Sequence, residues 1–168
     1  WILAGTGFVV NPDGEMRNRA WLFDPTGRLS YFQDKVYLTP FEKERLSLSP
    51  GRVSEAKRFT IAGITFGLTI CRDGFFSTWQ RRLDPVDIWL EIRANGAVWS
   101  PEVRERFNGA LAERVTATGA DGGASTSLNG SFLDFLWQGP AYVVDATGRR
   151  IMQSRRVDDD SVLIVSVQ

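Results

Sequence analysis

One cysteine and one lysine are the residues of this sequence whose positions could support covalent chemistry. Cys71 directly follows an apolar segment at residues 64–70 and precedes the polar run Arg72-Asp73-Gly74. A thiol at the end of a strand faces a crevice, and a following backbone N–H can face a developing oxyanion. A lone cysteine is nonetheless often a small buried hydrophobic residue, so position alone leaves both interpretations open.

Lys35 lies between Asp34 and a proline-containing loop, a place where an isolated lysine is most often solvated. Beside Cys71, its ammonium would lower the pKa of the thiol and could stabilise a tetrahedral oxyanion. Glu42 and Glu44 are candidate carboxylates in the same loop, although loop glutamates are usually solvated too. If these side chains meet, they support nucleophilic attack on an electrophilic carbon.

The composition excludes several other kinds of site. The chain has 1 Cys and no His, which excludes an intramolecular disulfide, cysteine-rich zinc sites and histidine-based catalytic triads. Its 20 basic and 20 acidic residues are scattered, so nucleic acid and anionic membranes are not expected partners. We expect a small-molecule partner and no cofactor or metal.

Turns and periodicity predict the elements that must position these residues. Strands are expected at residues 1–10, 19–23 and 29–32, with a turn at Asp24-Pro25-Thr26-Gly27. Residues 36–51 lack clean periodicity and are expected to form a long, functional connection. Strands at residues 58–61 and 64–70 are expected to pair, the second one ending at Cys71.

The second half of the sequence alternates between helix and strand signals. A helix at residues 75–83 and a strand at 86–90 would form a crossover, and a closing strand is expected at 161–167. Ser100 and Pro101 predict a helix start, and Gly119 a helix end. Residues 141–151 echo residues 20–30, either as two ordinary hairpins or as part of a pseudo-symmetric pair of sheets. The expected architecture is one α/β domain over residues 1–168.

As a set, these motifs resemble the nitrilase superfamily of carbon–nitrogen hydrolases. The most specific part is Tyr31-x-x-Asp34-Lys35, followed further along by Ile70-Cys71-x-Asp73-x-x-Phe76. The remaining matches span essentially the entire chain: Asn18-x-Ala20, Asp24-Pro-Thr-Gly27, Leu38-x-Pro40-Phe41, Gly51, Phe59, Gly63, Gly67, Arg81, Ala112-Glu113, Gly139 and Asp145-x-x-Gly148. The resemblance implies an α/β fold, the four-layer αββα sandwich of the nitrilase type, incomplete at the N-terminus.

The superfamily uses a Glu-Lys-Cys triad in which Glu takes the thiol proton, Cys attacks the C–N carbon and Lys supports the intermediate. By resemblance, Cys71 matches the nucleophile, Lys35 the lysine, and the amide of Arg72 a donor to the oxyanion. The principal glutamate of the family is expected upstream of the first residue. Glu42, or else Glu44, matches a further glutamate that some branches carry after the lysine.

Three polar residues follow the expected strand at 86–90, where relatives place small pocket residues. Glu91, Arg93 and Asn95 could bind a polar substrate, or the charged pair could form an ion pair that only shapes the wall. Departures from the family pattern include Tyr37 in place of a common His, Arg72 in place of an aromatic residue, and Ser77-Thr78 in place of Pro-Glu. These departures concern the subfamily more than the superfamily.

The resemblance implies a thiol-dependent hydrolase of a small amide or carbamoyl compound, acting through a thioester. Arg72 argues mildly against a nitrile substrate. The alternatives are an acyltransferase of the apolipoprotein N-acyltransferase branch, whose membrane-embedded N-terminal part would be missing, and a non-catalytic relative. Segments 38–41 and 95–99 resemble that acyltransferase branch. A homodimer is expected by resemblance, and a cytoplasmic location from the lone cysteine and the lack of a leader.

Overall fold

A computed structural model gives the structure of the chain, and it describes residues 1–96, 100–132, 134–154 and 163–164. Three antiparallel strands form one sheet in the order β1-β2-β3, with bounds β1 (Ile2–Val10), β2 (Met16–Phe23) and β3 (Leu29–Asp34). A six-stranded sheet has the order β11-β10-β7-β6-β5-β4, with bounds β4 (Phe59–Ile61), β5 (Ile64–Ile70), β6 (Ile88–Ala94), β7 (Gly122–Leu128), β10 (Tyr142–Asp145) and β11 (Arg150–Gln153). The pair β8 (Gly130–Phe132) and β9 (Phe135–Trp137) forms a separate small hairpin.

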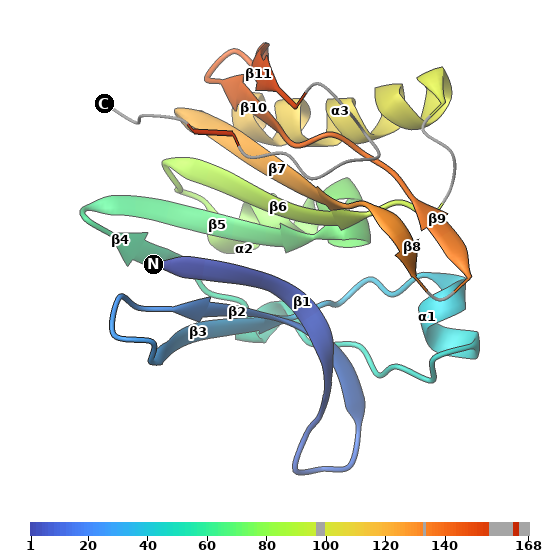
Figure 1. Cartoon of the computed structure of the whole chain (residues 1–168). Coiled ribbons are helices and arrows are strands. Elements are labelled where there is room, and N and C mark those ends of the chain that lie inside the picture. The colour runs from blue at the N-terminus through green and yellow to red at the C-terminus, as the bar shows by residue number, and fades with distance from the viewer. Residues whose placement is uncertain (97–99, 133, 155–162, 165–168) are drawn as a thin grey trace.

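The two longer helices of the described residues cover one face of the six-stranded sheet, and the three-stranded sheet covers the other (Figure 1). The helices are α1 (Pro40–Glu44), α2 (Thr78–Leu83) and α3 (Pro101–Thr118), with short 3-10 turns at Val53–Glu55 and Cys71–Phe75. The prediction of a mixed α/β domain is therefore confirmed. The described residues supply three layers, so the four-layer sandwich stays a prediction. Among the described residues, no helix has both the length and the apolarity that a membrane crossing requires.

Two separate apolar cores lie on the two faces of the six-stranded sheet. Trp79 and Leu83 of α2, Trp89 of β6, and Leu111 and Val115 of α3 are fully buried in the core on the helix side. On the other face, Ala20 of β2 packs with Leu68 and Ile70 of β5, between the two sheets. Side chains alternate along each strand, so β6 contributes Trp89 to the first core and Leu90 and Ile92 to the second. This arrangement fixes where β5 ends, and therefore where Cys71 stands.

Most of the predicted elements are present, with shifted bounds. The helix signals at Ser100 and Gly119 are confirmed, because the Ser100 side chain accepts from the Val103 N–H and Gly119 ends α3 in the left-handed region at φ 65°. The parallel pair β5 and β6, joined through α2, confirms the predicted crossover. The two similar hairpins lie in different sheets, β2-β3 in one and β10-β11 in the other. The predicted closing strand falls on residues outside the described part, apart from 163 and 164.

Two expectations about the elements are corrected. Residues 36–51 are not a helix-free connection, since they contain α1, whose N-cap Thr39 and Glu42 form a capping box. The strand expected to end at residue 90 continues to Ala94 as β6, because it pairs in register with both β5 and β7. Glu91 and Arg93 are therefore strand residues, and their side chains share the face of Trp89.

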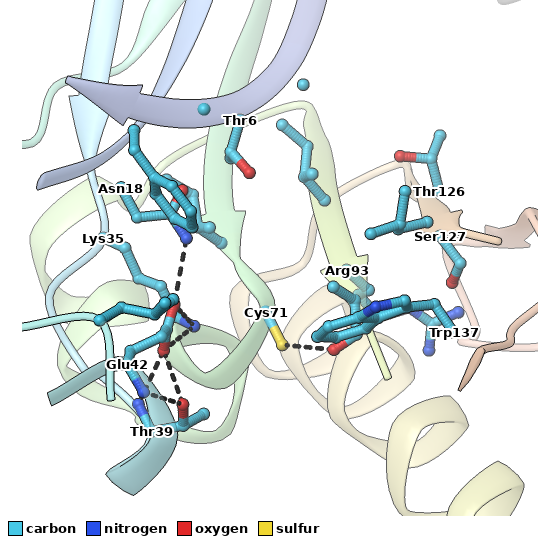
Figure 2. Close-up of a pocket in the computed structure, with 18 of the residues that line it drawn as sticks. Thr6, Asn18, Lys35, Thr39, Glu42, Cys71, Arg93, Thr126, Ser127 and Trp137 are labelled. Carbon is cyan, nitrogen blue, oxygen red and sulfur yellow. Dashed lines mark hydrogen bonds and ion pairs between the residues drawn. The ribbon is translucent and has the colours of Figure 1, made fainter. Parts of the chain in front are cut away.

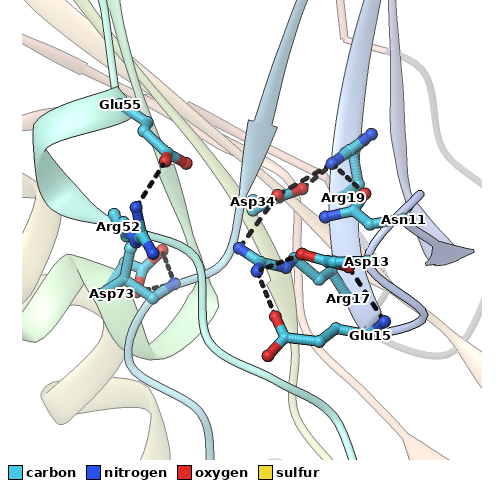
Figure 3. A network of polar contacts seen from close by, with 10 residues as sticks. Asn11, Asp13, Glu15, Arg17, Arg19, Asp34, Arg52, Glu55 and Asp73 are labelled. Carbon is cyan, nitrogen blue, oxygen red and sulfur yellow. Dashed lines mark hydrogen bonds and ion pairs between the residues drawn. The ribbon is translucent and has the colours of Figure 1, made fainter.

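A charged network on the three-stranded sheet fixes the end of β3 (Figure 3). Arg19 Nε and Nη2 donate to the two carboxylate oxygens of Asp34 at 2.6 and 2.9 Å, and the guanidinium lies 4.1 Å from the ring centre of Phe32. Arg17 pairs with Asp34 at 3.8 Å and also with Glu15. A bidentate arginine orients its carboxylate in a single geometry. The fixed geometry of Asp34 in turn positions the next residue, Lys35.

Candidate active site

Cys71 begins the 3-10 turn that follows β5, and its backbone is strained. Its φ is 49°, in the left-handed region that residues other than glycine rarely adopt. Such strain persists only where surrounding contacts enforce it, and it concentrates at functional sites. The strained turn presents the thiol at the carboxyl end of β5, and β5 is the strand that lies between β4 and β6 in the sheet.

Asp73 ties this turn to the segment that follows Lys35. Its fully buried carboxylate accepts from the backbone N–H of Tyr37 at 2.7 Å and of Val36 at 3.2 Å. Burial raises the pKa of Asp73 to about 7, although the two backbone donors and Lys35 oppose this shift. The loop with the thiol and the loop with the lysine are therefore joined through one side chain.

Arg114 of α3 supports the same turn from the helix side of the sheet. Its Nη2 donates to the Gly74 carbonyl at 2.6 Å, its Nη1 donates to Thr69 Oγ1 at 3.2 Å, and it lies 4.0 Å from Glu91. A Cβ at Gly74 would lie 2.5 Å from Glu91 Oε1 and 2.7 Å from Arg114 Nη2. Only glycine lets the turn approach this buried pair so closely.

Lys35 is held by its backbone on two sides. Its N–H donates to the Asn18 carbonyl at 2.8 Å, and its carbonyl accepts from the Gly51 N–H at 2.9 Å. A Cβ at Gly51 would lie 2.6 Å from the Cβ of Asp34, so glycine is required for this close approach. The side chain is only 3% exposed, so its direction is set by packing.

The Lys35 ammonium forms a bidentate ion pair with Glu42 of α1. Nζ donates to Oε1 at 2.7 Å and to Oε2 at 2.6 Å. Asn18 Nδ2 donates to Oε1 at 3.0 Å, and the Thr39 N–H donates to Oε2 at 2.8 Å (Figure 2). Burial acts to raise the pKa of Glu42, but Lys35 and these donors outweigh it, so the pKa is lowered. Glu42 is thus a stable carboxylate that orients the lysine.

Cys71, Lys35 and Glu42 line one cavity of about 510 Å³ between the two sheets (Figure 2). The thiol donates to the Ala94 carbonyl at 3.4 Å. Burial raises the pKa of Cys71, and the Lys35 charge opposes that shift. The structure therefore brings together the three residues that the sequence singled out as candidates, while their catalytic roles stay predictions.

Arg72 follows the nucleophile position, as expected for an oxyanion-hole donor. Its side chain turns toward the lysine loop, where Nη1 donates to the Leu38 carbonyl at 2.7 Å. The proposed oxyanion donor is the backbone amide, and that role stays a prediction. The side-chain contact gives the two loops a second connection besides Asp73.

Of the three expected substrate-binding residues, Arg93 lines the cavity that contains Cys71, and the binding roles of all three stay predictions. Glu91 is 2% exposed on the helix side of the sheet, away from the cavity, and lies 3.9 Å from Arg93. The Arg93 guanidinium stacks over the rings of Phe107 and Tyr142 on that same side. Residues 91 and 93 lie on the same face of β6, which places the two side chains close enough for the ion pair that was one of the two interpretations. Asn95, beyond β6, donates from Nδ2 to the Gln138 carbonyl at 3.4 Å.

Several cavity residues were not anticipated from the sequence. Thr126 and Ser127 come from the end of β7 and Trp137 from β9, and β1 contributes Thr6 and Phe8. The end of β7 lies beside the end of β6 in a parallel pair, which places Thr126 opposite Ile92. The aromatic residues Phe135 and Trp137, two positions apart, were the available signal for β9. No local pattern predicts that this hairpin reaches the cysteine.

Comparisons with solved structures give the same fold. The similar structures include a carbon–nitrogen hydrolase from Helicobacter pylori G27, with a TM-score of 0.75 and 18% identity over 92% of this chain and 57% of that chain. Saccharomyces cerevisiae Nit3, a member of branch 10 of the nitrilase superfamily, gives 0.75 and 18% over 94% and 56%. An amidase variant from Nesterenkonia sp. AN1 gives 0.72 and 19% over 91% and 56%.

No protein-family model and no curated protein matches the sequence. The chain spans only somewhat more than half the length of these three structures, at 57%, 56% and 56%. At identities below 20%, the agreement in structure concerns the fold. This chain has the fold of the carbon–nitrogen hydrolases of the nitrilase superfamily.

Proposed function

We propose that the protein hydrolyses the C–N bond of a small amide or carbamoyl compound, with Cys71 as nucleophile. The observation that carries this proposal is the strained turn that points the thiol into a cavity shared with the Lys35–Glu42 pair. The Nesterenkonia amidase variant carries the acetamide moiety of fluoroacetamide covalently at its active-site cysteine, which supports a thiol nucleophile on this fold.

In the first half-reaction, a carboxylate takes the thiol proton and the sulfur attacks the carbonyl carbon. The negative charge that develops on oxygen is stabilised by the Lys35 ammonium and the backbone N–H of Arg72. The C–N bond then breaks, the carboxyl group returns the proton to the departing amine, and a thioester remains on Cys71.

In the second half-reaction, water adds to the thioester carbon. The same carboxylate takes a proton from the water, and the tetrahedral intermediate collapses to a carboxylic acid. The thiolate leaves and regains its proton, which restores the starting state. The cycle requires neither redox change nor a bound group, and it uses the same oxyanion donors twice.

Glu42 is better suited to orienting Lys35 than to accepting the proton. Its two oxygens already accept from Lys35, Asn18 and Thr39, and these donors lower its pKa. A proton acceptor in catalysis works best with a pKa near the working pH. We assign the proton transfer to a second carboxylate in the complete natural protein that contains this chain.

Alkylation with iodoacetamide tests the nucleophile directly. Residues 1–168 contain 1 Cys, so an adduct mapped to this part of the protein reports on Cys71. We expect alkylation of the complete natural protein to proceed faster than that of a free thiol at pH 7 and to abolish amide turnover. Mass spectrometry during turnover should detect the acyl group on Cys71.

Cys71→Ser is the matched variant, since it keeps the size and removes the thiol. We expect loss of turnover by about 10³-fold or more, because the hydroxyl is far less acidic than the thiol. A protein that turns over amides normally after complete alkylation would overturn the proposal. Alkylation at the rate of a free thiol, without turnover, would favour the non-catalytic relative.

A further inference from the structure

A second cavity of about 430 Å³ is also lined by Cys71. It shares Thr39, Phe41, Cys71, Ala94 and Trp137 with the first cavity. Its other lining residues include Arg72 and Phe75 of the nucleophile turn, Arg106 and Phe107 of α3, and Phe135 of β9. The thiol therefore stands at the junction of two spaces.

The two cavities differ in charge. In the first, Lys35 is paired with Glu42, and Arg93 lies 3.9 Å from Glu91. The second contains Arg72 and Arg106, and among its described lining residues there is no Asp or Glu. Neither guanidinium forms an ion pair with a carboxylate of the described residues, so this side has two positive charges without a counter-ion from those residues.

Both arginines are positioned by contacts that leave donors available. Arg72 is half-buried and uses Nη1 on the Leu38 carbonyl, which leaves most of its five N–H donors for another acceptor. The Arg106 guanidinium lies 5.3 Å from the ring centre of Phe107 and 5.9 Å from that of Phe75. Aromatic faces restrict an arginine without occupying its in-plane hydrogen-bond donors.

We propose that this second cavity binds an anionic group, such as a carboxylate, on the substrate of Cys71. The chemical class is then a small amide that also bears a carboxylate. The aromatic walls would pack on its carbon chain, while Arg72 and Arg106 would bind the charge. The substrate assignment rests on the proposed function, whereas the preference of the cavity for anions can be measured without turnover.

Two alkylating reagents of nearly equal size test the preference. Iodoacetate is anionic and iodoacetamide is neutral, and both react with the same thiolate, so the rate ratio cancels the ionisation of the sulfur. Relative to a free thiol, we expect the ratio of iodoacetate to iodoacetamide rates at Cys71 to rise about tenfold, the effect of one charge-assisted hydrogen bond. Added salt should reduce the ratio.

Arg106→Gln should lower that ratio about threefold or more. Arg104→Gln is the matched control, because it removes the same charge from the same helix but lines a different groove. The control should leave the ratio unchanged. A ratio equal to that of the free thiol, or equal effects of the two variants, would overturn the proposal.

Turnover provides the second measurement. In the complete natural protein, kcat/KM for succinamate should exceed that for butyramide, and Arg106→Gln should reduce the quotient of the two values. If butyramide is the better substrate, the anion subsite is wrong and the hydrolase proposal stands. If neither amide is cleaved while iodoacetate is still preferred, the hydrolase proposal fails and the anion site stands.

Discussion

Lys35 and Glu42 form a buried ion pair, and Lys35 acts to lower the pKa of Glu42. Lys35→Met would leave the Glu42 carboxylate buried without its cation, and we expect a loss of about 3–5 kcal/mol in the free energy of unfolding. Urea unfolding measures this loss. The double variant with Glu42→Leu should recover part of the stability, because it removes both charges. A single-variant loss below about 1 kcal/mol would contradict a buried pair.

Asp73 gives the fold a pH dependence near neutrality. Its folded pKa of about 7 lies above the ordinary value of 3.8, chiefly because of burial. The contribution of this group to stability is therefore fully present below about pH 4 and is lost as the pH rises through about 7. Asp73→Asn can still accept from the two backbone amides but cannot ionise.

The comparison of Asp73→Asn with the parent protein isolates this effect. Relative to the parent, the variant should gain stability between pH 5 and pH 8, by at most about 4 kcal/mol. Urea unfolding at several pH values gives the difference, and the absence of histidine leaves few other groups that titrate in this range. A difference that does not change with pH would mean that Asp73 is ionised throughout.

At the scale of single residues, the sequence predicts the location of a side chain when that location depends only on the strand that carries it. Cys71 and Lys35 stand at the ends of β5 and β3, and the structure brings both to one cavity. Glu91 lies beside Arg93 and Arg114, a placement that the sequence could not predict because the extent of β6 depends on its pairing with β5 and β7. Trp137 reaches the cavity from a hairpin distant in sequence, and only the tertiary arrangement determines that contact.

At the scale of elements, the two similar hairpins offer a matched comparison. Asp24 and Asp145 each accept from the backbone and hydroxyl of a threonine two residues later, and Gly27 and Gly148 have φ of 81° and 77°. The turns therefore have the same local chemistry. Their surroundings differ, since a Cβ at Gly27 meets nothing within 4 Å, whereas one at Gly148 lies 3.1 Å from Ala112.

We expect Gly27→Ala to cost about 1 kcal/mol, which is the cost of a left-handed alanine alone. Gly148→Ala should cost about 1–3 kcal/mol more, because the methyl group also crowds α3. Thermal unfolding of the two variants measures the difference. Equal losses would show that α3 shifts to accommodate the methyl group without cost.

The ends of a helix could be predicted where the residues at those ends specify them locally. Ser100, Pro101 and Gly119 specify the ends of α3 without reference to the rest of the molecule. The same kind of signal was overlooked at α1, where Thr39 and Glu42 form a capping box in a segment without periodicity. The extent of β6 could not be predicted, because pairing with β5 and β7 extends it past its apolar run.

At the scale of the whole molecule, the six-stranded sheet separates two cores that share no residue. Leu68→Ala on the sheet side and Leu111→Ala on the helix side remove fully buried side chains, and each should cost about 2–5 kcal/mol. Since the side chains do not touch, the double variant should lose the sum to within about 0.5 kcal/mol. Denaturant unfolding tests this, and a clearly smaller loss would indicate a coupled core.

Homodimer formation stays a prediction, and analytical ultracentrifugation of the complete natural protein measures it. The similar structures are longer than this chain, so their activities apply here only as proposals. The fold class was predictable because helix and strand signals alternate along the sequence.

The Arg114 contacts make the nucleophile turn depend on α3. Until that helix packs, the Gly74 carbonyl lacks its donor and the backbone at Cys71 has less reason to remain strained. Sulfur reactivity should therefore emerge late during refolding, in step with the packing of α3 and after the strands have paired. Pulsed alkylation at successive refolding times would measure when Cys71 becomes reactive, and therefore when α3 packs.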